Sequence, residues 1–196
     1  MVTPARKPAF NKLRIIGGSL RGSKLDIADL PGLRPTPDRV RETLFNWLAP
    51  VIDGARCLDL FAGTGALGIE ALSRGAAAVD FIERDARLAR DLRDNLARLR
   101  QSARVREGDA LAVLNGAPEK PYDLVFLDPP FDANLWADAS SALEARDWLA
   151  ANALIYVESP ADAIFELPPT WQLHRESRAG AVRYALFRRS AKLHPG

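Results

Sequence analysis

The stretch Arg56-Cys-Leu-Asp-Leu-Phe-Ala-Gly-Thr-Gly-Ala-Leu-Gly68 decides the fold, because it has the pattern of a short buried strand that turns through glycines into a helix. Its first half is apolar apart from Asp59, as a central parallel strand covered on both faces should be. Gly63 and Gly65 permit a tight turn and a close approach to a ligand. The following helix directs free N–H groups and a positive dipole end at this loop. We therefore expect a cofactor here.

The spacing of Gly63, Gly65 and Gly68 matches the G-x-G-x-x-G of dinucleotide sites. Asp59 argues against a dinucleotide, because its carboxylate would meet the pyrophosphate. S-adenosylmethionine carries a sulfonium and an α-amino group, and such a cationic cofactor is attracted to an acid. A plain turn that binds nothing is the alternative, and spaced glycines beside an acid are a costly way to build one. The predicted cofactor site also takes in Phe61, Ala62, Arg84 and Asp128.

Length and composition indicate one globular domain. The chain has 196 residues, of which 47% are hydrophobic, enough for a substantial core without disulfides or metals. No apolar run reaches the ~18 residues of a membrane-spanning helix, and the N-terminus lacks a signal-peptide segment. The single cysteine, Cys57, lies in the predicted core and fits a reducing compartment. His174 and His194 have no cysteine or acid cluster at ligand spacing, so we expect no metal site.

Charge is distributed unevenly, although the net charge is only +2. Residues 1–24 carry six Lys or Arg and no acid, residues 172–196 carry six against one acid, and residues 25–171 carry 15 against 24. This asymmetry predicts that the ends of the chain hold a polyanion, and two solvated basic tails are the alternative. The candidates for phosphate contact are Arg14, Arg21, Lys24, Arg34, Arg39 and Arg41. One of Arg39 and Arg41 can contact the carboxylate of the cofactor instead.

Strand-like and helix-like segments alternate from residue 56 onward, the pattern of a parallel sheet with crossover helices. The chain divides into a basic extension, 1–35, and a main domain, 36–196. Within the extension, the pattern of Leu13–Ile16 and Lys24–Ile27 predicts a short hairpin or two extended segments around a Gly-rich turn. The predicted strands of the main domain are 57–61, 78–83, 103–107, 122–127 and 154–158, followed by an antiparallel hairpin of 171–177 and 181–188.

The predicted helices have apolar side chains at helical spacing. Thr36 caps the first, which starts at Pro37 and ends before Pro50. Leu88, Leu92, Leu96 and Leu99 line one face of a later helix, whose other face bears arginines that are either solvated or in contact with nucleic acid. Further helical segments are expected from residue 66, at 109–114 and at 133–151.

Two acids follow predicted strands at the edge where α/β folds bind nucleosides. Glu83 ends its strand twenty residues after Gly63, and there it can accept hydrogen bonds from both ribose hydroxyls; a surface acid that opens a helix is the alternative. Asp109 can accept from an adenine amino group while the N–H of Ala110 donates to the ring. The same residues are also typical of a helix N-terminus with Asp109 as the N-cap, so both interpretations of Asp109 stay open.

Asp128-Pro129-Pro130-Phe131 is the most specific chemical signal. The two prolines fix φ and donate no hydrogen bond, so the Asp128 carboxylate and nearby carbonyls form a rigid edge of acceptors. An exocyclic amine on a base is a poor nucleophile, because its lone pair is delocalised. Acceptors that hold its N–H groups favour a pyramidal nitrogen and gain strength as positive charge develops. Phe131 can stack on the base.

These motifs resemble a known family. D-x-F-A-G-T-G is similar to the first motif of Rossmann-like methyltransferases, and D-P-P-F to the fourth motif of amino-group nucleic-acid methyltransferases. The segments 14–22, 34–47 and His174-Arg-Glu with Ala179-Gly180 resemble the RsmD family of 16S rRNA guanine-N2 methyltransferases, over nearly the whole chain. Pro37 stands where we expect this family to have Thr more often.

The resemblance implies an α/β fold, the Rossmann-like class I S-adenosylmethionine-dependent methyltransferase. Its sheet is seven-stranded and mostly parallel, with an antiparallel C-terminal hairpin and a small N-terminal β extension. It also implies a cytoplasmic bacterial enzyme that methylates guanine 966 of 16S rRNA, in a small-subunit particle or an assembly intermediate. Three alternatives stay open: an NAD-linked oxidoreductase, a noncatalytic RNA-binding protein, and methylation of adenine N6 or of protein glutamine.

Overall fold

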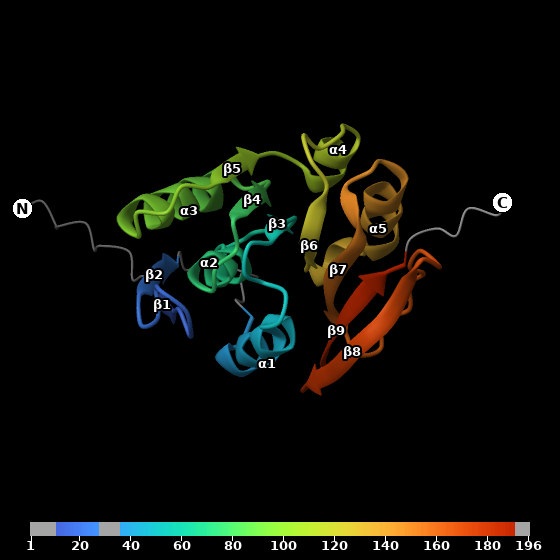
Figure 1. The fold of residues 1–196 in the computed structure, drawn as a ribbon, viewed down its shortest axis with the longest axis horizontal. Helices are drawn as coiled ribbons and strands as arrows, with labels where there is room; N and C mark the ends of the chain where they lie inside the picture. The colour runs from blue at the N-terminus through green and yellow to red at the C-terminus, as the bar shows by residue number, and fades with distance from the viewer. Residues whose placement is uncertain (1–10, 28–35, 191–196) are drawn as a thin grey trace, which may run out of the picture.

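The computed structural model describes residues 11–27 and 36–190 (Figure 1). Their central sheet consists of β3 (Arg56–Asp59), β4 (Ala78–Glu83), β5 (Arg104–Glu107), β6 (Tyr122–Leu127), β7 (Leu149–Pro160), β8 (Trp171–Ala179) and β9 (Val182–Arg189). The spatial order is β5-β4-β3-β6-β7-β9-β8. The first five strands of this order are parallel, and β9 is antiparallel to both β7 and β8. The predicted mixed sheet with an antiparallel C-terminal hairpin is confirmed.

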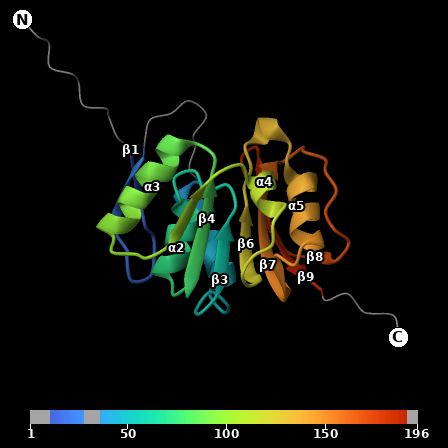
Figure 2. The same cartoon turned by 90° about the horizontal axis from the view of Figure 1, so that it is seen from above.

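Helices cover both faces of the sheet. They are α1 (Asp38–Leu48), α2 (Ala66–Ser73), α3 (Ala86–Arg98), α4 (Ala110–Leu114) and α5 (Trp136–Ala145), with a 3₁₀ turn η1 (Phe131–Ala133). The first three share one hydrophobic cluster with the hairpin of β1 (Asn11–Arg14) and β2 (Lys24–Ile27), while α4 and α5 share another. Figure 2 shows the hairpin beside α3 on one side of the molecule and α4 next to α5 on the other.

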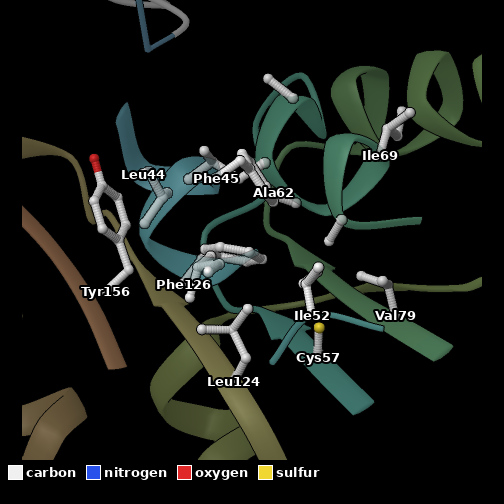
Figure 3. Packing of buried hydrophobic residues seen from close by; sticks show 14 of the residues in the cluster. Leu44, Phe45, Ile52, Cys57, Ala62, Ile69, Val79, Leu124, Phe126 and Tyr156 are labelled. Carbon is white, nitrogen blue, oxygen red and sulfur yellow. The ribbon is translucent and has the colours of Figure 1, made fainter. Parts of the chain in front are cut away.

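Strand side chains alternate between these two clusters, as the two-residue period of a strand requires. On β6, Phe126 joins the cluster of α1 to α3, and its neighbour Val125 joins the cluster of α4 and α5. The ring of Phe45 from α1 lies 6.1 Å from that of Phe126. Figure 3 shows this packing, with Leu44 and Phe45 of α1 beside Phe126 and Tyr156 of the sheet. Both faces of the sheet are therefore shielded from water at its centre, which explains why a central strand such as β6 has a near-continuous apolar sequence.

The hairpin is anchored to the main domain. Leu13, Ile15 and Leu25 are buried in the same cluster as α1 to α3. The side chain of Asn95 on α3 also exchanges hydrogen bonds with the backbone of Asp26. The expected hairpin is thus present, whereas the boundary at residue 35 stays a prediction, because residues 28–35 lie outside the described part.

The predicted helix at 133–151 is wrong at both ends. Helix α5 spans only Trp136–Ala145, and residues 149–151 belong to β7. Two non-glycine residues with positive φ, Asn134 at 49° and Asp147 at 55°, bracket the helix. A right-handed helix cannot pass through such residues, so the helix is confined between them.

The predicted cap of α1 is also wrong. Pro37 occupies the N-cap position, and no side chain caps the helix there. The Thr36 hydroxyl instead donates a hydrogen bond to Glu158 at 3.4 Å. The Thr36 side chain therefore bonds to a residue 122 positions away in the sequence instead of capping the helix, as the local sequence predicted.

Candidate active site

The loop after β3 is shaped by its glycines. Gly65 is the N-cap of α2 and has φ 74°, in the left-handed region that glycine adopts without steric cost. A Cβ at this position would also overlap the side chain of Leu92. At Gly68 a Cβ would overlap the ring of Phe81 on β4, so this glycine lets α2 pack closely on the sheet. The first turn of α2 is thereby held against the carboxyl end of β3.

Asp59 lies beneath this loop and is buried, with 3% of its surface exposed. Its Oδ2 accepts a hydrogen bond from the Gly68 N–H at 3.0 Å. Burial raises the pKa of Asp59 to about 7; the Gly68 hydrogen bond opposes this shift and the nearby charge of Glu83 adds to it. An acid in this state gains from a cationic ligand, because positive charge stabilises its ionised form.

Glu83 ties the same loop to the end of β4. Its Oε2 accepts from the Gly63 N–H at 2.7 Å, and its Oε1 accepts from the Asp85 N–H at 2.7 Å. Each oxygen of a carboxylate has two acceptor positions, so both keep one for a ligand. Phe61 is half-buried, Ala62 is buried and Arg84 is exposed. The backbone of Ala62 donates to the carbonyl of Ile82, which joins the loop to β4.

Asp109 acts as the N-cap of α4, since its Oδ1 accepts from the Ala112 N–H at 2.9 Å. The cap interpretation of its carboxylate is confirmed. Ala110 is the first residue of α4 and is buried. Its backbone N–H has no partner within a helix, as at any helix start, so a role for it beside an adenine ring stays a prediction.

The turn Asp128-Pro129-Pro130-Phe131, which we call the Asp128 corner, follows β6, the strand next to β3. Asp128 is half-buried, Pro129 is buried and Pro130 is exposed. Burial first, and the nearby charges of Glu158 and Asp59 next, raise the pKa of Asp128 well above its usual range. Phe131 begins η1 and is 40% exposed, so one large aromatic ring next to the acid is available for contact.

Glu158, near the end of β7, belongs to the same corner, and the sequence analysis missed it. It is buried, with 6% exposure, and its Oε2 accepts from the Tyr156 hydroxyl at 2.8 Å and from Thr36. Burial raises its pKa, while these two hydrogen bonds lower it. The signal was available, because Glu158 follows the apolar run 154–157 just as Glu83 ends its own strand.

Four acids therefore gather at the carboxyl edge of four adjacent strands, β4, β3, β6 and β7. They are Glu83, Asp59, Asp128 and Glu158, and we call them the acid edge. No salt bridge among the described residues involves them. No metal-binding group of three His, Cys, Asp or Glu is present in residues 11–27 and 36–190 either. The carboxylates and the glycine loop fit a cationic cofactor with a ribose, and they do not fit a pyrophosphate.

The predicted phosphate-binding residues divide into two groups. Arg14, Arg21, Lys24 and Arg39 are exposed, as phosphate contact requires. Arg34 lies outside the described residues. The prediction for Arg41 is wrong in this structure, because its side chain is fully buried.

Arg41 is instead part of a buried network. Its Nη2 donates to the carbonyl of Arg14 at 2.9 Å and to Asp38 at 2.6 Å, and its Nη1 lies 3.6 Å from Glu70. Neither phosphate nor cofactor carboxylate can reach the guanidinium in this conformation. The residue joins the hairpin, α1 and α2.

Comparison with known proteins now decides the family. A family model described as "Conserved hypothetical protein 95" matches residues 13–188. A protein of Escherichia coli (strain K12) named "Ribosomal RNA small subunit methyltransferase D" is 52% identical over 183 residues, which cover 92% of each chain. The chain belongs to the RsmD family. It is a methyltransferase, as its members are.

Two further relatives of the RsmD chain agree. The protein of the same name from Haemophilus influenzae is 47% identical, with 91% of this chain and 95% of that one covered. The solved structure of yhhF from Escherichia coli is 49% identical and superposes with a TM-score of 0.87, covering 93% of this chain and 100% of the other. The expected Rossmann-like methyltransferase fold is confirmed. In the described residues, no helix is long and apolar enough to span a bilayer.

Proposed function

We propose that this chain transfers the methyl group of S-adenosylmethionine to the exocyclic N2 amino group of a guanine in 16S rRNA. The observation that carries the proposal is the acid edge, where Glu83, Asp59 and Asp128 lie at the ends of three consecutive strands of the sheet, β4, β3 and β6. A cationic methyl donor and an amine acceptor would therefore meet over β3 and β6. The name of the relatives, which specifies ribosomal RNA of the small subunit, supports the RNA class.

On the cofactor side, Glu83 would accept from the ribose hydroxyls and Asp59 would attract the positively charged methionine part. When bound, S-adenosylmethionine would supply a methyl group activated by its sulfonium, whose carbon–sulfur bond breaks so that the sulfur leaves as a neutral thioether. The loop around Gly63 is already held by Glu83 at 2.7 Å, so these residues need little rearrangement to receive a ligand.

On the acceptor side, Asp128 would hold the amino group and Phe131 would stack on the base. As the nitrogen forms its new bond to carbon it becomes positive, and it must then lose one proton. A carboxyl whose pKa is raised by burial is a better proton acceptor than an ordinary one. Asp128 would therefore stabilise the developing charge and accept this proton.

The exposed basic residues of the hairpin and of α1 would hold the RNA backbone. Arg14, Arg21, Lys24 and Arg39 lie on elements that pack together through one hydrophobic cluster. Phosphate contacts of this kind fix the orientation of the RNA without reading its sequence. Guanine 966 as the target, a small-subunit particle as the substrate and the bacterial cytoplasm as the location follow from the family resemblance.

Mass spectrometry tests the proposal. Purified protein, S-adenosylmethionine and small subunits from a strain that lacks the gene should yield one N2-methylguanine in 16S rRNA. Naked 16S rRNA in parallel reactions separates the two possible forms of the substrate. Methylation of adenine N6 instead, or of a protein glutamine, would contradict the proposal.

A further inference from the structure

Glu158 lies beside Asp128 on the neighbouring strand. In the parallel pair of β6 and β7, Leu127 is in register with Val157, so the next residues, Asp128 and Glu158, are adjacent at the carboxyl edge. Neighbouring strands lie about 4.8 Å apart, which is within the reach of one nucleobase edge. A base whose amino group is held at Asp128 would therefore place one of the two ring atoms next to the amino-bearing carbon towards Glu158.

One oxygen of Glu158 is fixed and the other is available. Tyr156 and Thr36 both donate to Oε2. In the part of the chain that the structure describes, no donor is bonded to Oε1. Oε1 is also not one of the fully buried side-chain atoms that lack a hydrogen-bond partner. The carboxylate is thus held at one oxygen and presents an acceptor at the other.

The chemistry of the bases distinguishes the possible ligands of such an acceptor. Guanine carries an N1–H donor next to its N2 amino group, whereas adenine has an N1 acceptor next to its N6 amino group. An ionised carboxylate only accepts hydrogen bonds. We propose, on the basis of the function proposed above, that Glu158 selects guanine by accepting its N1–H while Asp128 holds the N2 amino group.

The main chain of Glu158 also positions the stacking residues. Its carbonyl accepts from Trp136 Nε1 at 2.8 Å. The Trp136 ring stacks on Phe165 at 5.1 Å and lies 6.1 Å from the ring of Phe131. One residue therefore fixes both the acceptor for the base edge and the aromatic group beneath the base face, as a selective pocket requires.

The test compares guanine with 2-aminopurine at the target position of the RNA substrate. 2-Aminopurine keeps the amino group at C2 but has an unprotonated N1, which would face the Glu158 carboxylate without a proton. Wild-type protein should prefer guanine on the order of 100-fold or more in kcat/KM, because a site built for a donor rejects a base that lacks it. Glu158→Gln should lower this preference at least about tenfold, since the amide can donate to N1.

Tyr156→Phe, which releases Oε2 and conserves shape, should lower the same ratio by a smaller factor. Glu144→Gln is the matched control, because Glu144 is half-buried and bonded to Arg189 and Trp171 away from this corner. The ratio is measured within one protein sample, so partial unfolding cancels. If Glu158→Gln and Tyr156→Phe reduce both reactions equally, Glu158 is only structural and the inference is wrong. If wild-type protein methylates neither base, the proposed function itself fails.

Discussion

Helix α2 and the acid edge both contain buried carboxylates, but only the buried carboxylate of α2, Glu70, has cations beside it. Glu70 on α2 is fully buried and accepts from Arg74 at 2.8 Å and from the backbone N–H groups of Ile16 and Gly17, with Arg41 at 3.6 Å. The acid edge has no such cation among the described residues, and its hydrogen bonds come from N–H groups and hydroxyls.

This difference separates a structural acid from functional ones. A buried charge whose partners are complete is costly to disturb and has nothing left to offer a ligand. Asp59, Asp128 and Glu158 have no cation beside them and have raised pKa values, so a cationic ligand or a developing positive charge can stabilise their ionised forms. The comparison predicts that substitutions in the two regions affect different measurements.

The largest effect is expected at Glu70. Glu70→Ala should reduce the free energy of unfolding by about 3–5 kcal/mol, because it removes the buried carboxylate that pairs with Arg74 and lies beside the buried guanidinium of Arg41. Urea denaturation measures this change. Glu176→Ala, which removes a partly exposed pair with Arg183, is the control and should cost at most about 1 kcal/mol. Equal losses for the two variants would remove the distinction between the regions.

Asp128→Ala should show the opposite profile. Loss of the acceptor for the target amine should slow methyl transfer on the order of 10²–10³-fold in single turnovers. Cofactor affinity and the free energy of unfolding should change little, since no cation loses its partner. Asp128→Asn should be milder, because the amide oxygen still accepts. Asp132→Ala, an exposed acid in the same turn, is the control, and an Asp128→Ala enzyme with the wild-type rate would exclude the proposed role.

At Glu83 the expected effect is on cofactor affinity. Glu83→Ala should weaken S-adenosylmethionine binding by roughly 1.5–3 kcal/mol, since hydrogen bonds to a charged acceptor are lost. Calorimetry measures the affinity. Glu107→Ala is a matched control, because Glu107 is in register with Glu83 at the end of the next strand, β5, and is exposed. Unchanged affinity in Glu83→Ala would place the ribose elsewhere.

The smallest effect concerns pH. The pKa of Asp59 is raised to about 7, so its ionised fraction rises between pH 6 and pH 8. Because only the ionised form attracts a cation, S-adenosylmethionine binding should strengthen up to about tenfold over this interval. Asp59→Asn keeps a hydrogen-bond acceptor for the Gly68 N–H, but its cofactor affinity should no longer rise between pH 6 and pH 8. Any titration of the cofactor itself is common to both proteins, so identical pH profiles would rule out a contribution from Asp59.

Local sequence patterns correctly predicted the strands whose bounds depend on their own residues. The strands β4 and β6 match their predicted bounds, since apolar β-rich runs between turn residues leave little choice. The expected strand at 154–158 is longer, because β7 begins at Leu149, which pairs with Tyr122 of β6 although 149–151 have a helical composition. Tertiary pairing thus overrides propensity.

The site was predictable where an acid follows a strand, and it was missed where the partner is distant. Asp59, Glu83 and Asp128 follow this rule, and their strands are adjacent; Glu158 follows it too but was overlooked. Arg41 lies next to the apolar stripe of α1, but its burial depends on Glu70, 29 positions further along the chain. No local sequence pattern predicts the contact of Arg41 with Glu70 or the hydrogen bond from Thr36 to Glu158.

The position of β9 has a consequence for synthesis on the ribosome. This strand lies inside the sheet, between β7 and β8, yet it is the last described strand to be translated. The strands of the acid edge emerge earlier, so a nascent chain can assemble them while β7 still has an open edge. Unpaired edges of this kind promote association with other chains. The insertion of β9 therefore ends the period in which the newly made protein is most exposed to aggregation.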